Sequence, residues 1–396
     1  MSSTVADRNL RGSDFAVGLS PQTAYGAVNA SPVFRPVRRT TGKPKTAIAY
    51  TQDDSVTTDN QGVDNIQDST EYTMELSSSM SKQSVFLLGT AIHGDFVNYT
   101  NTAATFEATG TGFILPAATY TALSVGDALW ISGFANDAID GFYIVESKDG
   151  SNTITTTIAP AATEAVGANV TLISNKCKNG LAPTYFTVQQ TTQTSTTPVY
   201  DTYYDMIVNT LSIEIGETGI VRSNFNMVGE RKLDQDTAVS GQSYSSKLTD
   251  RSVSASQDVT DWYVDGLLAT CIQKNMTINV DNAYTGDDAA ACARQYARGQ
   301  FAVSGSASFR AKLSDPLTWR TYYEQSIRKS MGVLITHPNS TDQTFVVMMQ
   351  NAITEHNQAD GSNDIANHEV SFGSEGHAAT ASTIMVFTNW NVSSAA

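Results

Sequence analysis

Hydrophobic and polar positions alternate with a period of two along much of the chain, which is typical of β-strands with one buried face. In TLSIEIG the aliphatic side chains fall on one side of the strand: Leu211, Ile213 and Ile215. The polar side chains fall on the other side: Thr210, Ser212 and Glu214. GETG at 216–219 then predicts a turn into IVRSNFNMVG, where a second set can share a face: Val221, Phe225 and Met227. The two segments together predict a β-hairpin.

The same alternation recurs later in the chain, in KNMTINVDN, FAVSGSASF, MGVLITH, TFVVMMQNAI, EVSFGS and STIMVFT. Such runs, separated by Gly, Asn, Asp and Ser, predict an all-β architecture.

One segment, SDPLTWRTYYEQSIRKS, has a helical pattern instead. Asp315 can act as the N-cap and Pro316 suits the first helical position. Apolar side chains recur at helical spacing: Trp319, Tyr323 and Ile327. Arg328 and Lys329 fall where the helix dipole favours cations, so the pattern predicts a helix over 316–329. A less regular pattern in VTDWYVDGLLATCI, residues 259–272, predicts a second helix interrupted by Gly266.

Two long polar stretches interrupt the strands. Residues 52–70 have no apolar periodicity and predict an extended loop. Residues 187–205 are rich in Thr and Gln, and the pattern leaves open an exposed strand pair or another loop.

Residues 86–175 differ in composition from the rest of the chain. They contain one basic residue, Lys148, and eight acidic residues, and Thr, Ala and Gly dominate. Short β-branched or aromatic runs alternate with turn residues, and Asp149-Gly150 predicts a hairpin between IVES and TITTTI. This stretch predicts a small β unit inserted into a larger domain.

Length and charge narrow the functional class. The 396 residues exceed one typical core of about 150 residues, so two or three structural units are expected. The formal charge is −15, with 39 acidic and 24 basic residues. Such an imbalance argues against a surface that grips nucleic acid, because that affinity comes largely from Lys and Arg on phosphates. No signal peptide or membrane-spanning run is recognisable.

Candidate chemistry is sparse. The three cysteines, Cys177, Cys271 and Cys292, lack C-x-x-C spacing and predict buried or free thiols in a reducing compartment. The five histidines have no metal-ligand spacing, and no nucleophile elbow, P-loop or dinucleotide fingerprint occurs. We therefore expect no catalytic site, no metal and no cofactor.

Two adjacent blocks of opposite charge stand out. The basic block, at 35–45, contains five basic side chains and no acid: Arg35, Arg38, Arg39, Lys43 and Lys45. The acidic block, at 53–75, contains seven acids and no base: Asp53, Asp54, Asp59, Asp64, Asp68, Glu71 and Glu75. Such blocks can form intrachain ion pairs, a solvated surface, or complementary faces that meet between copies of the protein.

The order of these segments resembles the major tail tube proteins of long-tailed, non-contractile (siphovirus-type) bacteriophages. The resemblance rests on APTYFTVQQ, the TLSIEIGETGIVRSNFNMVG hairpin, KNMTINVDN with RGQFAVSGSASF, the DPLTWRTYYEQ segment and the strands through STIMVF. It covers roughly residues 35–88 and 178–390. In that family an accessory β domain commonly interrupts the tube domain before a segment that here reads PTYFTV.

The resemblance implies a structural subunit and no enzyme. The fold would be a two-sheet antiparallel β-sandwich or half-barrel with one helix, carrying a small inserted β domain of immunoglobulin-like or barrel type. The division would be an N-terminal arm at 1–34, a tube domain at 35–89 plus 177–396, and an accessory domain at 90–176 on the tube's exterior.

The resemblance also implies partners and a location. Hexameric rings of this chain would stack into a tube in the virion tail, made in the host cytoplasm, with the 52–70 loop reaching an adjacent ring. Double-stranded DNA would pass through in transit, and a tape measure protein, a tail terminator and baseplate or tip proteins would bind the tube. The two charge blocks then become candidate contacts between subunits or rings.

An alternative from another class is a carbohydrate-binding or adhesive β-sandwich. Three aromatic residues of the insert could offer a sugar platform, although they also suit its core: Trp130, Phe134 and Tyr143.

Overall fold

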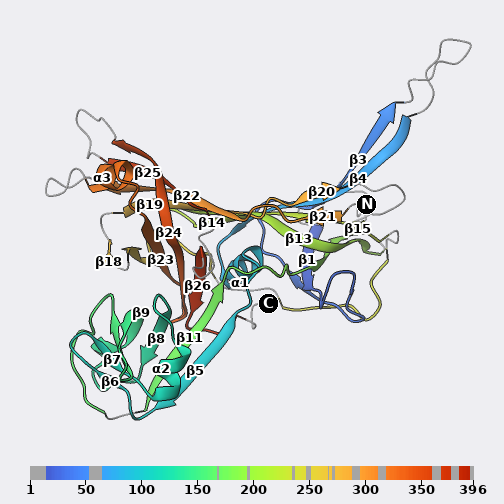
Figure 1. Cartoon of the computed structure of the whole chain (residues 1–396). Helices are drawn as coiled ribbons and strands as arrows, with labels where there is room; N and C mark the ends of the chain where they lie inside the picture. Colours follow the sequence, from blue (N-terminus) through green and yellow to red (C-terminus); the bar gives the residue numbers. More distant parts are fainter. Residues whose placement is uncertain are drawn as a thin grey trace, which may run out of the picture.

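The computed structural model describes residues 15–52, 65–166, 169–193, 197–233, 237–246, 251–265, 267–269, 273–287, 295–310, 318–358, 367–375 and 383–392. Strands dominate these residues, with three α-helices and one short 3₁₀ turn, η3 (Asp137–Ile139). The predicted all-β class is confirmed, with three α-helices in the described residues where the resemblance implied one. Figure 1 shows a long sheet with a smaller β unit beneath one end and a narrow hairpin extending from the other.

Eight antiparallel strands form the largest element, here called the eight-stranded sheet. Their spatial order is β3 (Pro44–Gln52), β4 (Asn65–Ser79), β14 (Arg222–Gly229), β13 (Val199–Ile215), β19 (Gln273–Asp281), β22 (Ala302–Arg310), β25 (Asn367–Glu375) and β24 (Gln343–Gln358).

The two long strands β13 and β24 leave this sheet and continue into neighbouring ones. The first half of β13 pairs with β12 (Phe186–Thr192) and β15 (Arg231–Lys232). Beyond β12 lie β1 (Phe15–Pro21), β2 (Val33–Pro36) and β16 (Ser243–Tyr244). The first half of β24 pairs with β23 (Lys329–Thr336) and β26 (Ile384–Thr388). The N-terminal arm was expected over residues 1–34. Its described part contains β1, which is paired on both sides within a sheet.

The main core lies on one face of the eight-stranded sheet. The alternating aliphatic residues predicted to share a face are buried there, including Leu211, Ile213 and Ile215, each 2% exposed. The predicted hairpin is also confirmed, because β13 pairs with β14 from Ile207↔Val228 to Glu214↔Arg222.

A helix that the sequence analysis missed fills this core. In α1 (Lys82–Ala91) and the residue after it, Val85, Leu88 and Ile92 are fully buried. Gln83, Ser84 and Thr90 are buried as well. Because the helix is enclosed on all sides, its sequence lacks the apolar-polar contrast that marks a surface helix.

The helix predicted over 316–329 is shorter than expected. In the described part, α3 spans Thr318–Glu324, and β23 already begins at Lys329. Ser326 adopts a left-handed φ of 53°, and the Ile327 N–H donates to the Tyr322 carbonyl (2.9 Å). This is a Schellman ending with Ser in the place usually taken by Gly. Arg328 and Lys329 therefore do not cap the helix, and Asp315 and Pro316 lie outside the described residues.

The second predicted helix, over 259–272, is wrong. The segment forms β17 (Val259–Val264) and β18 (Leu267–Leu268), and β17 pairs with β23. Val264 pairs directly with Leu267, and Asp265 has a φ of 51°. In the sequence, Asp-Gly between two strands is the strongest short-range hairpin signal, and here it outweighs the helical spacing.

The two polar stretches also differ from expectation. The loop expected over 52–70 is strand up to Gln52 and again from Asn65, with 53–64 outside the described residues. Residues 187–205 are a strand pair, β12 with β13, but not an exposed one. Gln189 is 1% exposed, and its buried amide is satisfied by donating to Thr202 Oγ1 (3.1 Å) and Gln242 Oε1 (2.9 Å).

Residues 97–178 build the smaller β unit. Its elements are β5 (Val97–Ala103), β6 (Glu107–Ala108), β7 (Gly112–Ile114), α2 (Ala117–Ala122), β8 (Ala128–Ser132), β9 (Gly141–Lys148), β10 (Thr153–Thr156) and β11 (Val170–Lys178). They enclose a separate apolar cluster that includes Phe106, Phe113 and Leu172. The predicted hairpin at Asp149 is confirmed: β9 pairs with β10, and Asp149 Oδ1 accepts from the Thr153 N–H (2.9 Å).

The smaller unit is joined to the rest by more than its chain connections. β11 pairs with β5 and β8 in the unit, and its last residues pair with β26. A third apolar cluster lies at this junction and includes Ala128, Tyr263 and Phe345. A separate two-stranded sheet, β20 (Thr285–Asp287) with β21 (Gln295–Ala297), completes the described strands.

Candidate functional site

The face of the eight-stranded sheet opposite the core is lined by hydroxyl and amide side chains. One row crosses five neighbouring strands in register: Ser77, Asn224, Ser212, Asn279 and Ser304. The residues between them along each strand are buried, so alternation places this whole row away from the core. We call this surface the polar face.

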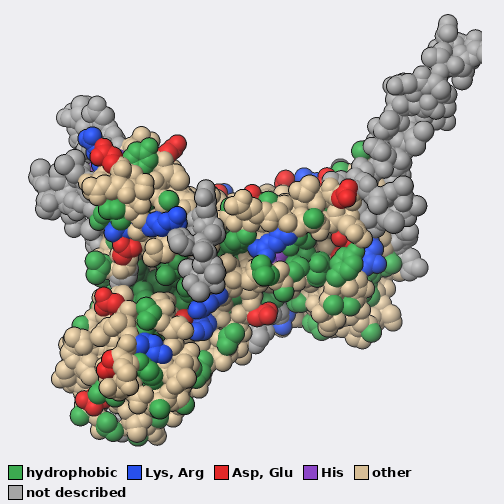
Figure 2. Space-filling view, viewed as in Figure 1, with side chains coloured by type: hydrophobic (Ala, Val, Ile, Leu, Met, Phe, Trp, Pro, Cys, Tyr) green, Lys and Arg blue, Asp and Glu red, His purple; other side chains and the backbone are tan. Residues whose placement is uncertain are grey.

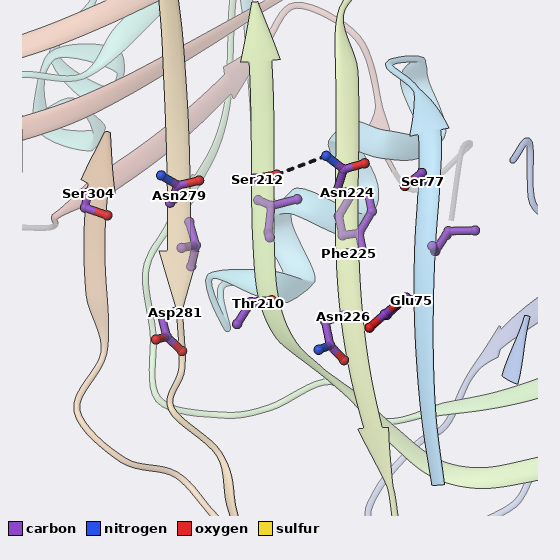
Figure 3. A pocket seen from close by; sticks show the side chains of 13 residues that line it. Glu75, Ser77, Thr210, Ser212, Asn224, Phe225, Asn226, Asn279, Asp281 and Ser304 are labelled. Atoms are coloured by element: carbon purple, nitrogen blue, oxygen red, sulfur yellow. Dashed lines mark hydrogen bonds between the residues drawn. The ribbon is translucent and has the colours of Figure 1, made fainter. Parts of the chain in front are cut away.

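A shallow groove runs across the polar face, and Figure 3 shows its side chains projecting from neighbouring antiparallel strands. Within it, the Asn224 amide donates to Ser212 Oγ and to Glu214 Oε1, each at 3.2 Å. The side chains are mostly short and polar, and the groove is open to solvent.

Charged groups on the polar face are flanked by neutral ones. A second row reads Glu75, Asn226, Thr210 and Asp281. In a third row Glu214 is paired in register with Arg222 across β13 and β14. These charges do not form a basic patch, and such a face gives DNA phosphates little to bind.

Both ends of the eight-stranded sheet are open among the described strands. β3 pairs with β4 alone. From residue 352 onward, β24 pairs with β25 alone. Unpaired strand edges offer a row of backbone N–H and C=O groups to another chain.

The β3–β4 hairpin extends away from the body of the molecule (Figure 1). Residues 45–49 of β3 are exposed at every position, so neither face of this part of the strand is covered. Ile48 is 44% exposed. A two-stranded ribbon is marginally stable alone in water, so this geometry suits a surface that another molecule covers.

The basic block lies at the base of this hairpin, but its members differ in role. Arg39 supports the subunit itself, because its guanidinium donates to the carbonyls of Gly42 (2.6 Å) and Phe15 (2.9 Å). The Arg38 N–H donates to Gln83 Oε1 (3.3 Å), and its guanidinium reaches Ser252 Oγ (3.5 Å). Arg35 is half-buried in β2, whereas Lys43 and Lys45 are exposed.

Only part of the acidic block can be placed. Asp53, Asp54, Asp59 and Asp64 lie outside the described residues, and Asp68 lies in β4. Within the described part of the two blocks, Lys45 Nζ forms an ion pair with Glu75 Oε2 at 3.8 Å, and both side chains are mostly exposed. Such a pair contributes little to stability, which leaves contacts between copies as an open role for the blocks.

No group of three or more His, Cys, Asp or Glu side chains that could hold a metal occurs in the described part of the chain. Cys177 is a buried free thiol, and burial raises its pKa to about 12, so it is inert as a nucleophile. Cys271 and Cys292 lie outside the described residues.

A polar cluster lies where β13 meets β15, with Asp205 and Glu230 buried and Tyr25 and Arg231 partly open to solvent. Asp205 is enclosed, accepts from the Gly26 N–H (2.8 Å) and forms an ion pair with Arg231. The Tyr25 hydroxyl donates to Glu230, and this bond with burial raises the pKa of Tyr25 to about 12. These contacts tie the segment after β1 to the sheet, which makes them structural.

Two of the three aromatic residues considered for a sugar platform lie in the core, as the other interpretation predicted, and Trp130 of β8 is half-buried. Phe134 and Tyr143 are 4% and 7% exposed and belong to the core of the smaller β unit. Phe113 packs against both rings. On the face seen in Figure 2, acidic and basic side chains are scattered, with no single dominant patch.

Sequence reasoning named Thr210, Ser212 and Glu214 as one side of a strand but could not assign them to a site. The missing information was the pairing order, because β4, β19 and β22 lie far from β13 in the chain. The signal was present as small polar residues at the outward positions of all these strands.

No helix in the described residues is long and apolar enough to cross a membrane. A family model described as phage tail tube protein matches residues 12–374. The search of curated proteins found no match.

Proposed function

The chain belongs to the phage tail tube protein family, a structural component of the virion tail, and from this premise we propose how it builds the tube. Six copies close into a ring, the rings stack into a long non-contractile tube of siphovirus type, and the genome passes through its channel. The polar face of the eight-stranded sheet lines that channel.

The observation that carries the proposal is the asymmetry of the eight-stranded sheet. One face covers the main core, the other is polar along neighbouring strands, and both edges are open. A sheet of this kind becomes a closed wall when its edges meet those of other copies.

The polar face suits a channel for DNA. A duplex carries one negative charge per ~1.7 Å of axis, so a wall rich in Lys and Arg would retain it. Hydroxyls and amides in the row from Ser77 to Ser304 hold water instead, and the acids Glu75 and Asp281 repel phosphate. DNA therefore slides past this surface without being held.

Contacts between copies use the sheet edges and the hairpin. In the proposed ring, β3 of one copy meets residues 352–358 of β24 in the next. The β3–β4 hairpin reaches an adjacent ring, where the exposed Lys43 and Lys45 and the acidic block form complementary contacts. Arg39 is a weaker candidate for a contact between copies, because its guanidinium already donates to backbone carbonyls within the subunit.

The remaining assignments follow the same logic. We propose that residues 90–176 form an accessory domain on the exterior and that 35–89 with 177–396 form the tube domain. A tape measure protein, a tail terminator and baseplate or tip proteins are the expected partners, and the chain itself catalyses no reaction.

Negative-stain electron microscopy of the purified full-length protein tests the proposal. We expect rings with a central channel, and tubes at higher concentration. A Lys43→Glu/Lys45→Glu variant should form fewer tubes at low salt, and Lys274→Glu, with its charge paired to Glu217, serves as the control. A persistent monomer at all concentrations would contradict the proposal, and indifference to salt and charge reversal would remove the role of the blocks.

A further inference from the structure

Two histidine side chains contact each other across the outermost strand pair of the eight-stranded sheet. His356 lies in β24 and His368 in β25, and His356 Nε2 is 3.0 Å from His368 Nδ1. The rings lie at 30° to each other with centroids 5.2 Å apart. In register His356 pairs with Val370 and Gln358 with His368, so the two rings are diagonal cross-strand neighbours.

The pair lies on the core side of the sheet, near α3. His368 is 2% exposed, and His356 is half-buried. Beside them Trp319 of α3 stacks on Phe309 of β22 with centroids 4.2 Å apart, and Phe309 pairs with His368 in register.

The charged groups around the pair come from several elements. From α3, Arg320 and Glu324 both act on His356 and form an ion pair at 2.7 Å. On β24 and β25, alternation places Glu355 and Glu369 on the opposite, polar face, and Arg310 at the end of β22 shares that face.

A distance of 3.0 Å between two ring nitrogens is a hydrogen bond only when one carries a proton and the other a lone pair. Two neutral rings satisfy this, and so does a pair with one added proton, because that proton can sit on an outer nitrogen. Two added protons put N–H groups on both facing atoms. The bond is then lost, and two positive charges meet beside Arg320.

We propose that His356 and His368 form an acid-sensitive latch that holds the outer strand β24 against β25 and releases it when both rings are protonated.

Electrostatics supports this assignment. Burial, the positive charge on His368 and Arg320 together lower the pKa of His356 below its ordinary value, so the latch stays closed at neutral pH. The same guanidinium counts against a divalent cation between the two nitrogens.

The consequence for assembly rests on the proposed function. Residues 352–358 of β24 form one of the two edges that would join copies, so release of the latch weakens the ring at that joint. Tubes formed at neutral pH would then open at these joints on acidification.

Hydrogen–deuterium exchange of the full-length protein at pH 7.5 and pH 5.0, corrected for intrinsic rates, tests the latch. We expect peptides covering 352–358 to exchange at least about tenfold faster at pH 5.0, because a shift of one pKa unit corresponds to a tenfold change in an equilibrium constant. In His356→Gln this pH effect is lost. In Asn357→Gln, which alters the opposite face of the same strand, it is retained.

Equal protection of 352–358 at both pH values in the wild type overturns the proposal, whatever the variants do. So does an unchanged acid effect in His356→Gln. Failure of the protein to form rings at pH 7.5 contradicts the proposed function but not the latch, since exchange is measured within the subunit.

Discussion

At the scale of single residues, polar groups in this subunit are bound to one another more than they are available to ligands. Arg39 binds two backbone carbonyls, Asp205 binds Arg231, and His93 is 4% exposed with its Nε2 3.3 Å from the Tyr284 hydroxyl. Such groups define how the strands meet, and changes in them alter stability before they alter assembly.

His93 should make the subunit sensitive to acid. Burial, and then the nearby Arg298, lower the pKa of His93 from 6.5 to about 4 in the folded state. Between those values the unfolded chain binds a proton that the folded chain does not, so stability falls as the pH drops from about 6.5 to about 4. The loss reaches about 3 kcal/mol, from 1.36 kcal/mol per unit.

Urea unfolding at pH 7 and pH 4.5 measures this effect. His93→Asn, which tolerates the left-handed φ of 54°, should reduce the stability difference between the two pH values. Tyr284→Phe keeps His93 and should therefore retain the stability difference between the two pH values. Equal acid sensitivity in wild type and His93→Asn contradicts the prediction.

Arg39 should matter for folding more than its neighbours in the basic block. Arg39→Ala removes two charge-assisted hydrogen bonds and should lower the free energy of unfolding by about 1–3 kcal/mol. The exposed Lys43→Ala should stay within about 0.5 kcal/mol of wild type. Similar values for the two variants, measured by chemical denaturation, would show that Arg39 has no special structural role.

At the scale of elements, most strands follow from the sequence, as does α3 in shortened form, whereas α1 does not. Alternation identified β13, β14, β19 and β22 with their buried faces, because each has one core side and one solvent side. It failed for α1, which is buried all round, and for β17 and β18, where a two-residue turn decides the structure. The polar face could not be predicted without the order of the strands, which depends on pairing between residues far apart in the chain.

The end of α3 offers a test of the backbone argument. Ser326 occupies the left-handed C′ position, which Gly adopts without steric cost. Ser326→Gly should therefore raise the free energy of unfolding by about 0.5–1 kcal/mol, visible as a higher Tm. Gln325→Gly, one residue earlier and without a positive φ, should lower it; a lower Tm for Ser326→Gly contradicts the Schellman assignment.

At the scale of the whole molecule, the smaller β unit is fixed to the body by the pairing of β11 with β26, and a buried charge within the unit lies beside this junction. Asp127 is fully enclosed between Lys176 and Lys178, with Lys178 Nζ at 3.4 Å, and accepts from the Ser124 N–H at 2.9 Å. Next to it, Ala128 belongs to the junction cluster with Tyr263 and Phe345. An accessory domain attached in this way would hold a fixed direction on the tube.

Asp127→Asn should loosen this junction. It leaves two lysines without their anion and should cost about 2 kcal/mol, below the usual figure for a fully buried pair because both lysines reach solvent. Faster hydrogen exchange in β26 and at the end of β11 would locate the effect. The exposed Asp137→Asn, in the same unit, should change neither; equal exchange in both variants contradicts the role of Asp127.

The central claim is that the polar face of the eight-stranded sheet lines the channel of a self-assembled tube. Electron cryomicroscopy of tubes grown from the full-length protein tests it most directly. We predict that the row from Ser77 to Ser304 borders the channel, with β3 of each copy beside β24 of the next and residues 90–176 outside. A map in which this row faces away from the channel, or in which the apolar core side lines it, would contradict the account.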